Sequence, residues 1–259
     1  MSGNSVRSSA LSPTACRDLI ATAQAAGSVE EIHRICGELC ELAGFDYFIY
    51  GAEFPTSLVR PQTVIISGFP TAWREHYDTE GYIRIDPTVR HCVTRSTPLI
   101  WNDIIPLDDH EEATIRQFMG EAADFGLRSG VSFPTHGQHG EAAMLSLVSS
   151  DPYSTASDRI LWVLPAGQLL VGYIHEAARR IFDRENILLD RVSLTGRERE
   201  CLLWAAEGKT ASDTAQILGI SERTVLFHLH NAAEKLDVTN RSQAVARAVA
   251  QGYIKPQFG

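Results

Sequence analysis

The sequence is poor in cysteine and contains no closely spaced cysteine pair. Its five cysteines are scattered over 259 residues without a CxxC motif, and an odd number cannot pair completely. This distribution argues against a disulfide framework and indicates free, mostly buried thiols in a reducing compartment. Cys36 and Cys40 lie one helical turn apart, and packing in a hydrophobic core explains that pair better than a metal site does.

Long hydrophobic runs are also absent. The most apolar stretch, residues 160–174, is interrupted by a proline, two glycines and a glutamine, whereas a membrane-spanning helix needs about 20 consecutive apolar residues. Residues 1–13 are polar and rich in serine, which is unlike a signal peptide. We therefore expect a cytoplasmic protein with no membrane partner.

Catalytic motifs are missing as well. The sequence has no GxSxG nucleophile elbow. Possible metal ligands occur in residues 108–112 and 136–139, but both segments look like solvated loops. We therefore expect no catalytic residue, no metal and no cofactor, and an enzyme such as a lactone hydrolase is the weaker hypothesis. A phosphoryl-accepting receiver domain is also disfavoured, because the first predicted strand lacks the paired acidic residues that such a domain requires.

Basic residues are too few for a protein that coats nucleic acid non-specifically. The formal charge is −9, from 23 Lys and Arg against 32 Asp and Glu. The balance changes along the chain, because residues 191–259 contain nine basic and seven acidic residues whereas the remainder contains 14 and 25. An acidic regulatory part joined to a mildly basic DNA-binding part would give this distribution, and so would a simple requirement for solubility.

The apolar pattern predicts a mixed domain followed by a helical one. Helical spacing covers residues 14–43 with a break at Gly27; further helices are expected at 70–81, 111–125 and about 157–182, and strands at 45–54, 63–67, 130–135 and 142–149. This order predicts an α+β fold, with an α/β/α layered ligand-binding domain around an antiparallel sheet. We expect a flexible tail at 1–13, the ligand-binding domain at 14–182, a linker at 183–193 and an all-α four-helix domain at 194–259.

Four helix-start signals follow one another at regular intervals in residues 194–259. Thr195 and Glu198 form a capping box, and Thr210, Ser221 and Asn240 begin the next three helices. This rhythm is typical of a helix-turn-helix module, in which one short helix crosses the DNA backbone and the next enters the major groove. In the third helix one stripe is expected to be buried, and the opposite stripe is expected to face the groove: Arg223, Leu226, Phe227 and His230.

This region resembles the LuxR-type helix-turn-helix. About 60 residues follow the pattern LTxRExExLxWxAxGKTxxxIAxxLxISxxTVxxH with the correct spacing. The resemblance implies that the third helix binds base edges and that the N-termini of the two central helices hold phosphates. On this sequence it gives DNA-binding candidates on the phosphate side, Lys209, Thr210 and Ser221, and on the base side, Arg223, Leu226, Phe227 and His230, together with Thr224.

Leu226 departs from the LuxR-type pattern. Many members have Lys or another polar residue at this position, and a leucine cannot bind guanine but can contact a thymine methyl group. Packing of Leu226 against Phe227 is an equally good explanation. The scarcity of basic residues on this face implies weak binding by a monomer, and hence a homodimer on a two-fold symmetric double-stranded DNA operator. RNA polymerase is a further candidate partner.

A second informative segment spans residues 69–101. Trp73 and Tyr77 lie four residues apart on one face of the predicted 70–81 helix, and Asp86 stands between Ile85 and Pro87. A buried aspartate needs a hydrogen-bond donor, and a pocket built from these residues would suit a ligand with an apolar chain and an amide or ester head. From the spacing alone, an ordinary aromatic core with one satisfied aspartate is the better explanation.

The same segment, within residues 30–150, is very similar to the autoinducer-binding domain of LuxR-type quorum-sensing regulators, particularly the LasR-like branch. The match WREHYxxxGYxRxDPTVxHC begins at Trp73. The resemblance implies an N-acyl-homoserine lactone whose lactone carbonyl accepts from Trp73, whose amide N–H donates to Asp86 and whose acyl carbonyl bonds Ser146. It also implies roles around the ligand for four neighbours: Tyr77 and Trp101 flanking the head group, Thr88 beside the amide, and Arg74 reaching a 3-position oxygen through water.

Phe69 departs from this pattern, because LasR-like members have a tyrosine there that shares the acyl carbonyl with the serine. Its loss removes one hydrogen bond, worth about 1 kcal/mol, and we expect a relaxed or unusual preference for the acyl chain. The sequence thus predicts a small-molecule inducer and a ligand-responsive transcriptional regulator of quorum sensing. The alternative is a LuxR-type regulator without its own synthase that responds to a different small apolar or amide-containing ligand.

Overall fold

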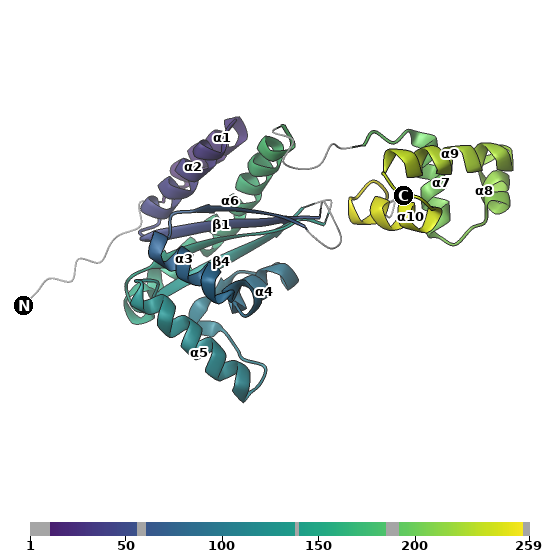
Figure 1. Cartoon of the computed structure of the whole chain (residues 1–259). Helices are drawn as coiled ribbons and strands as arrows, with labels where there is room; N and C mark the ends of the chain where they lie inside the picture. The colour runs from purple at the N-terminus through teal and green to yellow at the C-terminus, as the bar shows by residue number, and fades with distance from the viewer. Residues whose placement is uncertain (1–10, 56–60, 138–139, 185–191, 256–259) are drawn as a thin grey trace, which may run out of the picture. The chain divides into compact units, whose positions relative to one another are not determined.

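Figure 1 shows the computed structural model of the chain, which describes residues 11–55, 61–137, 140–184 and 192–255. These residues form two compact units, one of helices around a sheet and one of helices alone. Most of the expected tail at 1–13 and of the expected linker at 183–193 lies outside the described residues, so the domain boundaries stay predictions.

The first unit is built around a five-stranded sheet with the order β2-β1-β5-β4-β3, in which the pairs β1–β5, β5–β4 and β4–β3 are antiparallel. The predicted α+β fold is confirmed. Its elements are α1 (Pro13–Ala25), α2 (Val29–Leu42), β1 (Tyr47–Phe54), β2 (Gln62–Ser67), α3 (Thr71–Glu80), η1 (Tyr82–Arg84), α4 (Pro87–Thr94), β3 (Leu99–Ile100), η2 (Trp101–Asp103), α5 (Asp109–Asp124), β4 (Ser129–His136), β5 (Ala142–Ser149) and α6 (Tyr153–Arg184).

Helices cover both faces of this sheet (Figure 1). α1, α2 and α6 lie on one face, and α3, α4 and α5 lie on the other. The long helix α6 approaches β4 closely at Gly167, where an added Cβ would come within 2.3 Å of the Phe133 ring. A side chain at that position would collide with the buried Phe133 ring, so glycine favours this close packing.

Two local features differ from the sequence-based expectation. Helix α4 was not predicted, although Asp86 caps its N-terminus and Pro87 occupies its first turn, both common helix-start signals. The acidic segment at residues 108–112 was interpreted as a loop, but Asp108 is the N-cap of α5 and the following residues form its first turn. Negative charge is favourable there because of the helix dipole, which explains the acidic residues without a metal.

The second unit consists of α7 (Gly196–Ala206), α8 (Ala211–Leu218), α9 (Glu222–Lys235) and α10 (Arg241–Ala250). The four predicted caps are confirmed, because the side chains of Thr195, Thr210, Ser221 and Asn240 each accept a hydrogen bond from the backbone N–H three residues on. Gly219 ends α8 with φ of 66°, a left-handed conformation that glycine adopts without strain. These caps and this turn define the short helix-to-helix connection between α8 and α9.

The core of the helical unit is apolar, and an ion pair between the buried Glu198 and the exposed Lys235 lies at its edge. Glu198 accepts the backbone N–H of Thr195, and its two carboxylate oxygens accept from Lys235 Nζ at 2.9 and 2.8 Å. This bond ties the start of α7 to the end of α9. The buried residues are Leu194, Cys201, Leu202, Ala215, Val225, Leu229, Ala232, Ala233, Leu236, Ala244, Ala248 and Ile254.

Candidate functional site

A cavity of about 290 Å³ lies between the sheet and the helices α3, α4 and α5. Strands β1, β2 and β5 contribute its other walls. Every ligand-binding residue predicted from the sequence lines it: Phe69, Trp73, Arg74, Tyr77, Asp86, Thr88, Trp101 and Ser146. The fold thus brings together, around one cavity, side chains that are up to 77 residues apart in the sequence.

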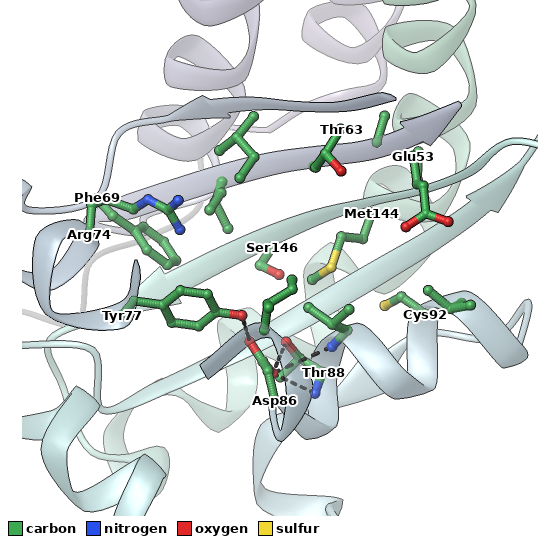
Figure 2. Close-up of a pocket in the computed structure, with 18 of the residues that line it drawn as sticks. Glu53, Thr63, Phe69, Arg74, Tyr77, Asp86, Thr88, Cys92, Met144 and Ser146 are labelled. Carbon is green, nitrogen blue, oxygen red and sulfur yellow. Dashed lines mark hydrogen bonds between the residues drawn. The ribbon is translucent and has the colours of Figure 1, made fainter. Parts of the chain in front are cut away.

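Asp86 is the centre of the polar part of this cavity (Figure 2). Its Oδ1 accepts from the backbone N–H of Thr88 at 2.8 Å, from the Thr88 hydroxyl at 2.7 Å and from the Val89 N–H at 3.4 Å. Its Oδ2 accepts from the Tyr77 hydroxyl at 3.0 Å. Asp86 therefore has two functions at once, since it caps α4 and presents a carboxylate to the cavity.

Burial dominates the electrostatics at this carboxylate. It raises the pKa of Asp86 above its ordinary value, although the hydrogen bonds from Thr88, Tyr77 and Val89 act in the opposite direction. Burial, together with the neighbouring Asp86, also raises the pKa of the Cys92 thiol to about 12. Cys92 is therefore a neutral thiol in the cavity wall and not a nucleophile. One more hydrogen-bond donor facing Asp86 would be favourable.

Trp73 presents a hydrogen-bond donor to the cavity. Its indole ring is buried among Tyr77, Tyr82, Phe118 and Phe125, with centroid separations of 5.5 to 6.1 Å. No hydrogen-bond acceptor for the indole N–H is found among the described residues, and the ring lines the cavity. A tryptophan that is buried usually finds a partner for this group, so the cavity is where an acceptor would lie.

Ser146 belongs to a short chain of hydrogen bonds. Its hydroxyl lies 2.7 Å from that of Ser132, the directly paired residue on β4, and the Trp101 indole donates to the same Ser132 oxygen at 2.9 Å. Gly130 lets Trp101 lie this close, because an added Cβ would be 3.1 Å from the indole and 2.9 Å from the Leu147 carbonyl oxygen. Ser132 was missed in the sequence analysis, although the antiparallel register of β4 and β5 places it opposite Ser146.

A second polar network holds α3 against α5 outside the cavity. Glu121 Oε2 lies 2.7 Å from His76 Nε2 and accepts a short hydrogen bond from the Tyr82 hydroxyl, while Gln117 donates to Oε1 at 2.9 Å. The hydrogen bond from Tyr82 and those from His76 and Gln117 lower the pKa of Glu121 to about 2. The network fixes the helix that carries Trp73 and Tyr77. The sequence analysis gave Glu121 no role.

The two ends of the cavity differ in chemistry (Figure 2). Phe69 and Arg74 lie at one end, and Glu53, Thr63 and Cys92 lie at the other, with Met144 and Ser146 on the strand between them. The Arg74 guanidinium lies 5.3 Å from the centre of the Tyr77 ring and pairs with Asp78 at 3.4 Å. Arg74 is therefore already held by neighbours at the edge of the cavity.

The helical unit presents the predicted outward stripe. Arg223, Leu226, Phe227 and His230 are exposed on α9, while Val225 and Leu229 on the opposite side are buried in the core. His230 pairs with Glu234 at 3.5 Å. The stripe extends over about two helical turns on the outer side of α9, where a helix that enters the major groove presents its side chains.

The residues predicted to hold phosphates lie at the starts of α8 and α9. Thr210 is engaged in a capping box, since its hydroxyl donates to Asp213 Oδ2 at 2.7 Å and accepts from the Asp213 N–H at 3.1 Å. Asp213 therefore already supplies negative charge at the start of α8. Ser221 accepts the Thr224 N–H at 3.1 Å, and the two hydroxyl oxygens lie 2.7 Å apart. The Lys209 side chain is exposed.

The described ranges contain neither a cluster of metal ligands nor a membrane-spanning helix. No three His, Cys, Asp or Glu side chains there come together in a group that could hold a metal ion. No helix in the same part of the chain has the combined length and apolar character needed to cross a bilayer.

Both units match known protein-family models. Residues 28–178 match the autoinducer binding domain, and residues 192–248 match the bacterial regulatory proteins of the luxR family. The first match covers the cavity, and the second covers α7, α8, α9 and most of α10.

Related proteins match along most of their length. The chain is 36% identical over 238 residues to the transcriptional activator protein VanR of Vibrio anguillarum, covering 92% of this chain and 97% of VanR. It is 38% identical over 217 residues to AhyR of Aeromonas hydrophila, covering 83% and 82%. It is 33% identical over 236 residues to LuxR of Aliivibrio fischeri, covering 87% and 88%.

Solved structures share the fold of this chain. Escherichia coli SdiA matches with a TM-score of 0.73 and 25% identity, covering 94% of this chain and 99% of SdiA. A complex of SdiA with octanoyl-rac-glycerol matches with a TM-score of 0.74 and 26% identity, covering 95% and 97%.

Proposed function

Since this chain belongs to the LuxR family of autoinducer-binding transcriptional regulators, we propose that it senses an N-acyl-homoserine lactone and then binds a two-fold symmetric DNA operator as a homodimer. The ligand assignment rests on two groups in one cavity: the buried carboxylate of Asp86, and the Trp73 indole N–H, which has no acceptor in the part of the chain that the structure describes. An acyl-homoserine lactone supplies the matching groups, an amide N–H and a lactone carbonyl.

The proposed hydrogen bonds of the lactone use three side chains of the cavity. Asp86 would accept from the amide N–H, and Trp73 would donate to the lactone carbonyl. Ser146 would donate to the acyl carbonyl, because Ser132 lies within hydrogen-bond distance of it and can accept or donate in turn. The acyl chain would occupy the apolar part of the cavity, where its burial contributes about 0.8 kcal/mol per methylene.

The neighbouring residues would shape the head-group end of this pocket. Tyr77 and Trp101 would flank the lactone ring, and Thr88 would lie beside the amide. Phe69 offers no hydroxyl to the acyl carbonyl, so the acyl side depends on Ser146 alone. Arg74 is paired with Asp78, and a water-mediated contact to a 3-position oxygen would have to compete with that pair.

The DNA-binding assignment rests on the outward stripe of α9. Arg223, Leu226, Phe227 and His230 would contact base edges, and Lys209, Thr210, Ser221 and Thr224 would lie near phosphates. Asp213 at the start of α8 weakens the phosphate role of Thr210, because it already occupies that helix end. Few cations face the DNA, so two copies on one symmetric operator would be needed for strong binding. The protein would act as a regulator and not as an enzyme.

One observation supports a second ligand class. SdiA, which has the same fold, has been solved with octanoyl-rac-glycerol, a molecule with an ester in place of the amide. A ligand of that kind would leave Asp86 without an amide donor but could still use Trp73 and Ser146. The chain would then be a LuxR-type regulator that responds to a different apolar ligand.

The test compares the full-length protein expressed alone, with a panel of N-acyl-homoserine lactones, and with octanoyl-glycerol. A ligand that binds the folded state raises the midpoint of thermal unfolding, so we expect at least one lactone to raise both soluble yield and midpoint. Trp73→Phe keeps an aromatic ring but removes the indole N–H, and we expect it to weaken the affinity up to about tenfold.

Trp162→Phe is the matched control, because Trp162 is exposed on α6 and does not line the cavity. A thermal shift with octanoyl-glycerol but with no lactone would favour the second ligand class. No shift with any lactone would refute the first, and steady consumption of a lactone would contradict the non-enzymatic role.

A further inference from the structure

Two large apolar side chains stand next to each other on the outer face of α9. Leu226 is 54% exposed and Phe227 is 58% exposed. Neither is among the residues that pack against the core of the helical unit. Whether or not Leu226 packs against Phe227, both side chains offer more than half of their surface to the solvent.

The orientation of this pair is set by the buried side of the same helix. Val225 and Leu229 are buried in the core, so residues 226 and 227 must point outward. The pair follows Arg223 by one helical turn, and no ion-pair or hydrogen-bond partner of Arg223 is found among the described residues. The outer stripe of α9 therefore offers one available guanidinium beside two apolar groups, which suits an anionic partner that also carries apolar groups.

We propose that Leu226 and Phe227 recognise the C5-methyl groups of thymines in the major groove. This inference rests on the proposed function, in which α9 enters that groove. Thymine is the one standard base that presents a methyl group there, and apolar side chains recognise it by contact rather than by hydrogen bonds. Neither Leu226 nor Phe227 has a hydrogen-bonding group, so the donors and acceptors of the other bases cannot satisfy them. The Arg223 guanidinium beside them would approach the phosphates or a guanine edge.

The proposal predicts a sensitivity to the methyl group itself. Removing one buried methyl costs about fourfold in affinity, and replacement of thymine by deoxyuridine changes nothing else in the groove. The same reasoning extends to 5-methylcytosine, which carries the methyl group at the same ring position. A cytosine in place of the contacted thymine should bind more weakly than a 5-methylcytosine there, again by about fourfold.

The experiment begins with selection of binding sites by the full-length protein from a randomised DNA duplex library, with the stabilising lactone present. In the strongest selected site each symmetric pair of thymines is then replaced by deoxyuridine, and the affinity is measured at fixed salt. We expect that deoxyuridine at one or two positions of each half-site lowers the affinity about fourfold per methyl group removed. Failure to select any site would refute the proposed DNA-binding function, whereas strong sites without any methyl effect would refute this inference alone.

Matched variants identify the side chains. Leu226→Gln and Phe227→Gln each replace an exposed apolar group by a helix-compatible polar one. We expect the thymine-to-deoxyuridine affinity ratio to approach one in the double variant. Ile217→Gln is the control, because Ile217 is 46% exposed on α8 and lies outside the α9 stripe, and it should leave the ratio unchanged. If the double variant still bound the thymine site more tightly than the deoxyuridine site by the wild-type ratio, the assignment to Leu226 and Phe227 would be overturned.

Discussion

The hydroxyl groups of Ser132 and Ser146 lie 2.7 Å apart at directly paired positions of β4 and β5. Both are buried, and Ser132 also accepts the indole N–H of Trp101 at 2.9 Å. Ser132 does not line the cavity itself, yet it positions two side chains that do. It is therefore a positioning residue for Trp101 and Ser146.

Ser132→Ala should reduce both stability and ligand affinity. The change leaves the buried Trp101 N–H without an acceptor, which costs about 1–3 kcal/mol of unfolding free energy, and it releases Ser146. Urea unfolding and ligand titration measure the two effects. Ser129→Ala is the control, since the Ser129 hydroxyl donates to the Asp151 carbonyl at 2.8 Å outside the cavity. Equal losses of ligand affinity in both variants would contradict a positioning role.

Asp86 needs two variants because it has two functions. Asp86→Ala removes the cap of α4 and should cost about 0.5–2 kcal/mol of unfolding free energy. Asp86→Asn keeps a good cap and should be clearly more stable than the alanine variant. Both should lose most of the lactone affinity, because neither offers a carboxylate to the amide N–H. Full affinity in Asp86→Asn, measured by titration, would show that the charge is not used.

Glu121 should make the free energy of unfolding of the first unit depend on pH in the acidic range. Because the pKa of Glu121 is lowered to about 2 from its ordinary 4.5, its carboxylate stabilises the folded state above about pH 4.5. This contribution is lost progressively as the pH falls from about 4.5 to about 2. Urea unfolding at several pH values should show wild type more stable than Glu121→Gln near pH 6, and the difference should disappear towards pH 2. A constant difference would contradict this assignment.

Two glycines should respond to alanine in opposite directions. Gly130→Ala would place a Cβ 2.9 Å from a backbone carbonyl and 3.1 Å from Trp101, so it should destabilise the protein and disturb the pocket. Gly120 is exposed in α5 and has no atom within 4 Å of an added Cβ. Gly120→Ala should therefore stabilise the protein by up to about 1 kcal/mol through helix propensity. Urea unfolding of both variants checks the signs.

Local signals predicted most elements of the structure. The four caps of the helical unit and the buried stripe of α9 follow from residue type and spacing alone, and the structure confirms them. Helix α4 had equally good signals in Asp86 and Pro87, but it is only eight residues long. Its aspartate was interpreted through a ligand instead of through the helix that it begins.

Contacts between distant elements were harder to predict. The pairing of Ser132 with Ser146 could have been derived, because both strands were predicted and a short connection between antiparallel strands fixes their register. The network of Glu121 with His76 and Tyr82 could not, since it depends on how α5 packs against α3. The sequence pattern of a surface glutamate gives no indication of which helix it will meet.

Helix α4 has a consequence for how occupancy of the cavity could be observed. Eight residues are too few for a helix to persist in water through its own hydrogen bonds, so α4 exists because Asp86 caps it and the sheet supports it. Anything that bonds Asp86 acts on the residue that begins this helix. A ligand that bonds Asp86 would therefore stabilise the cap of α4, and slower exchange of the α4 amide protons with solvent would report the bound state.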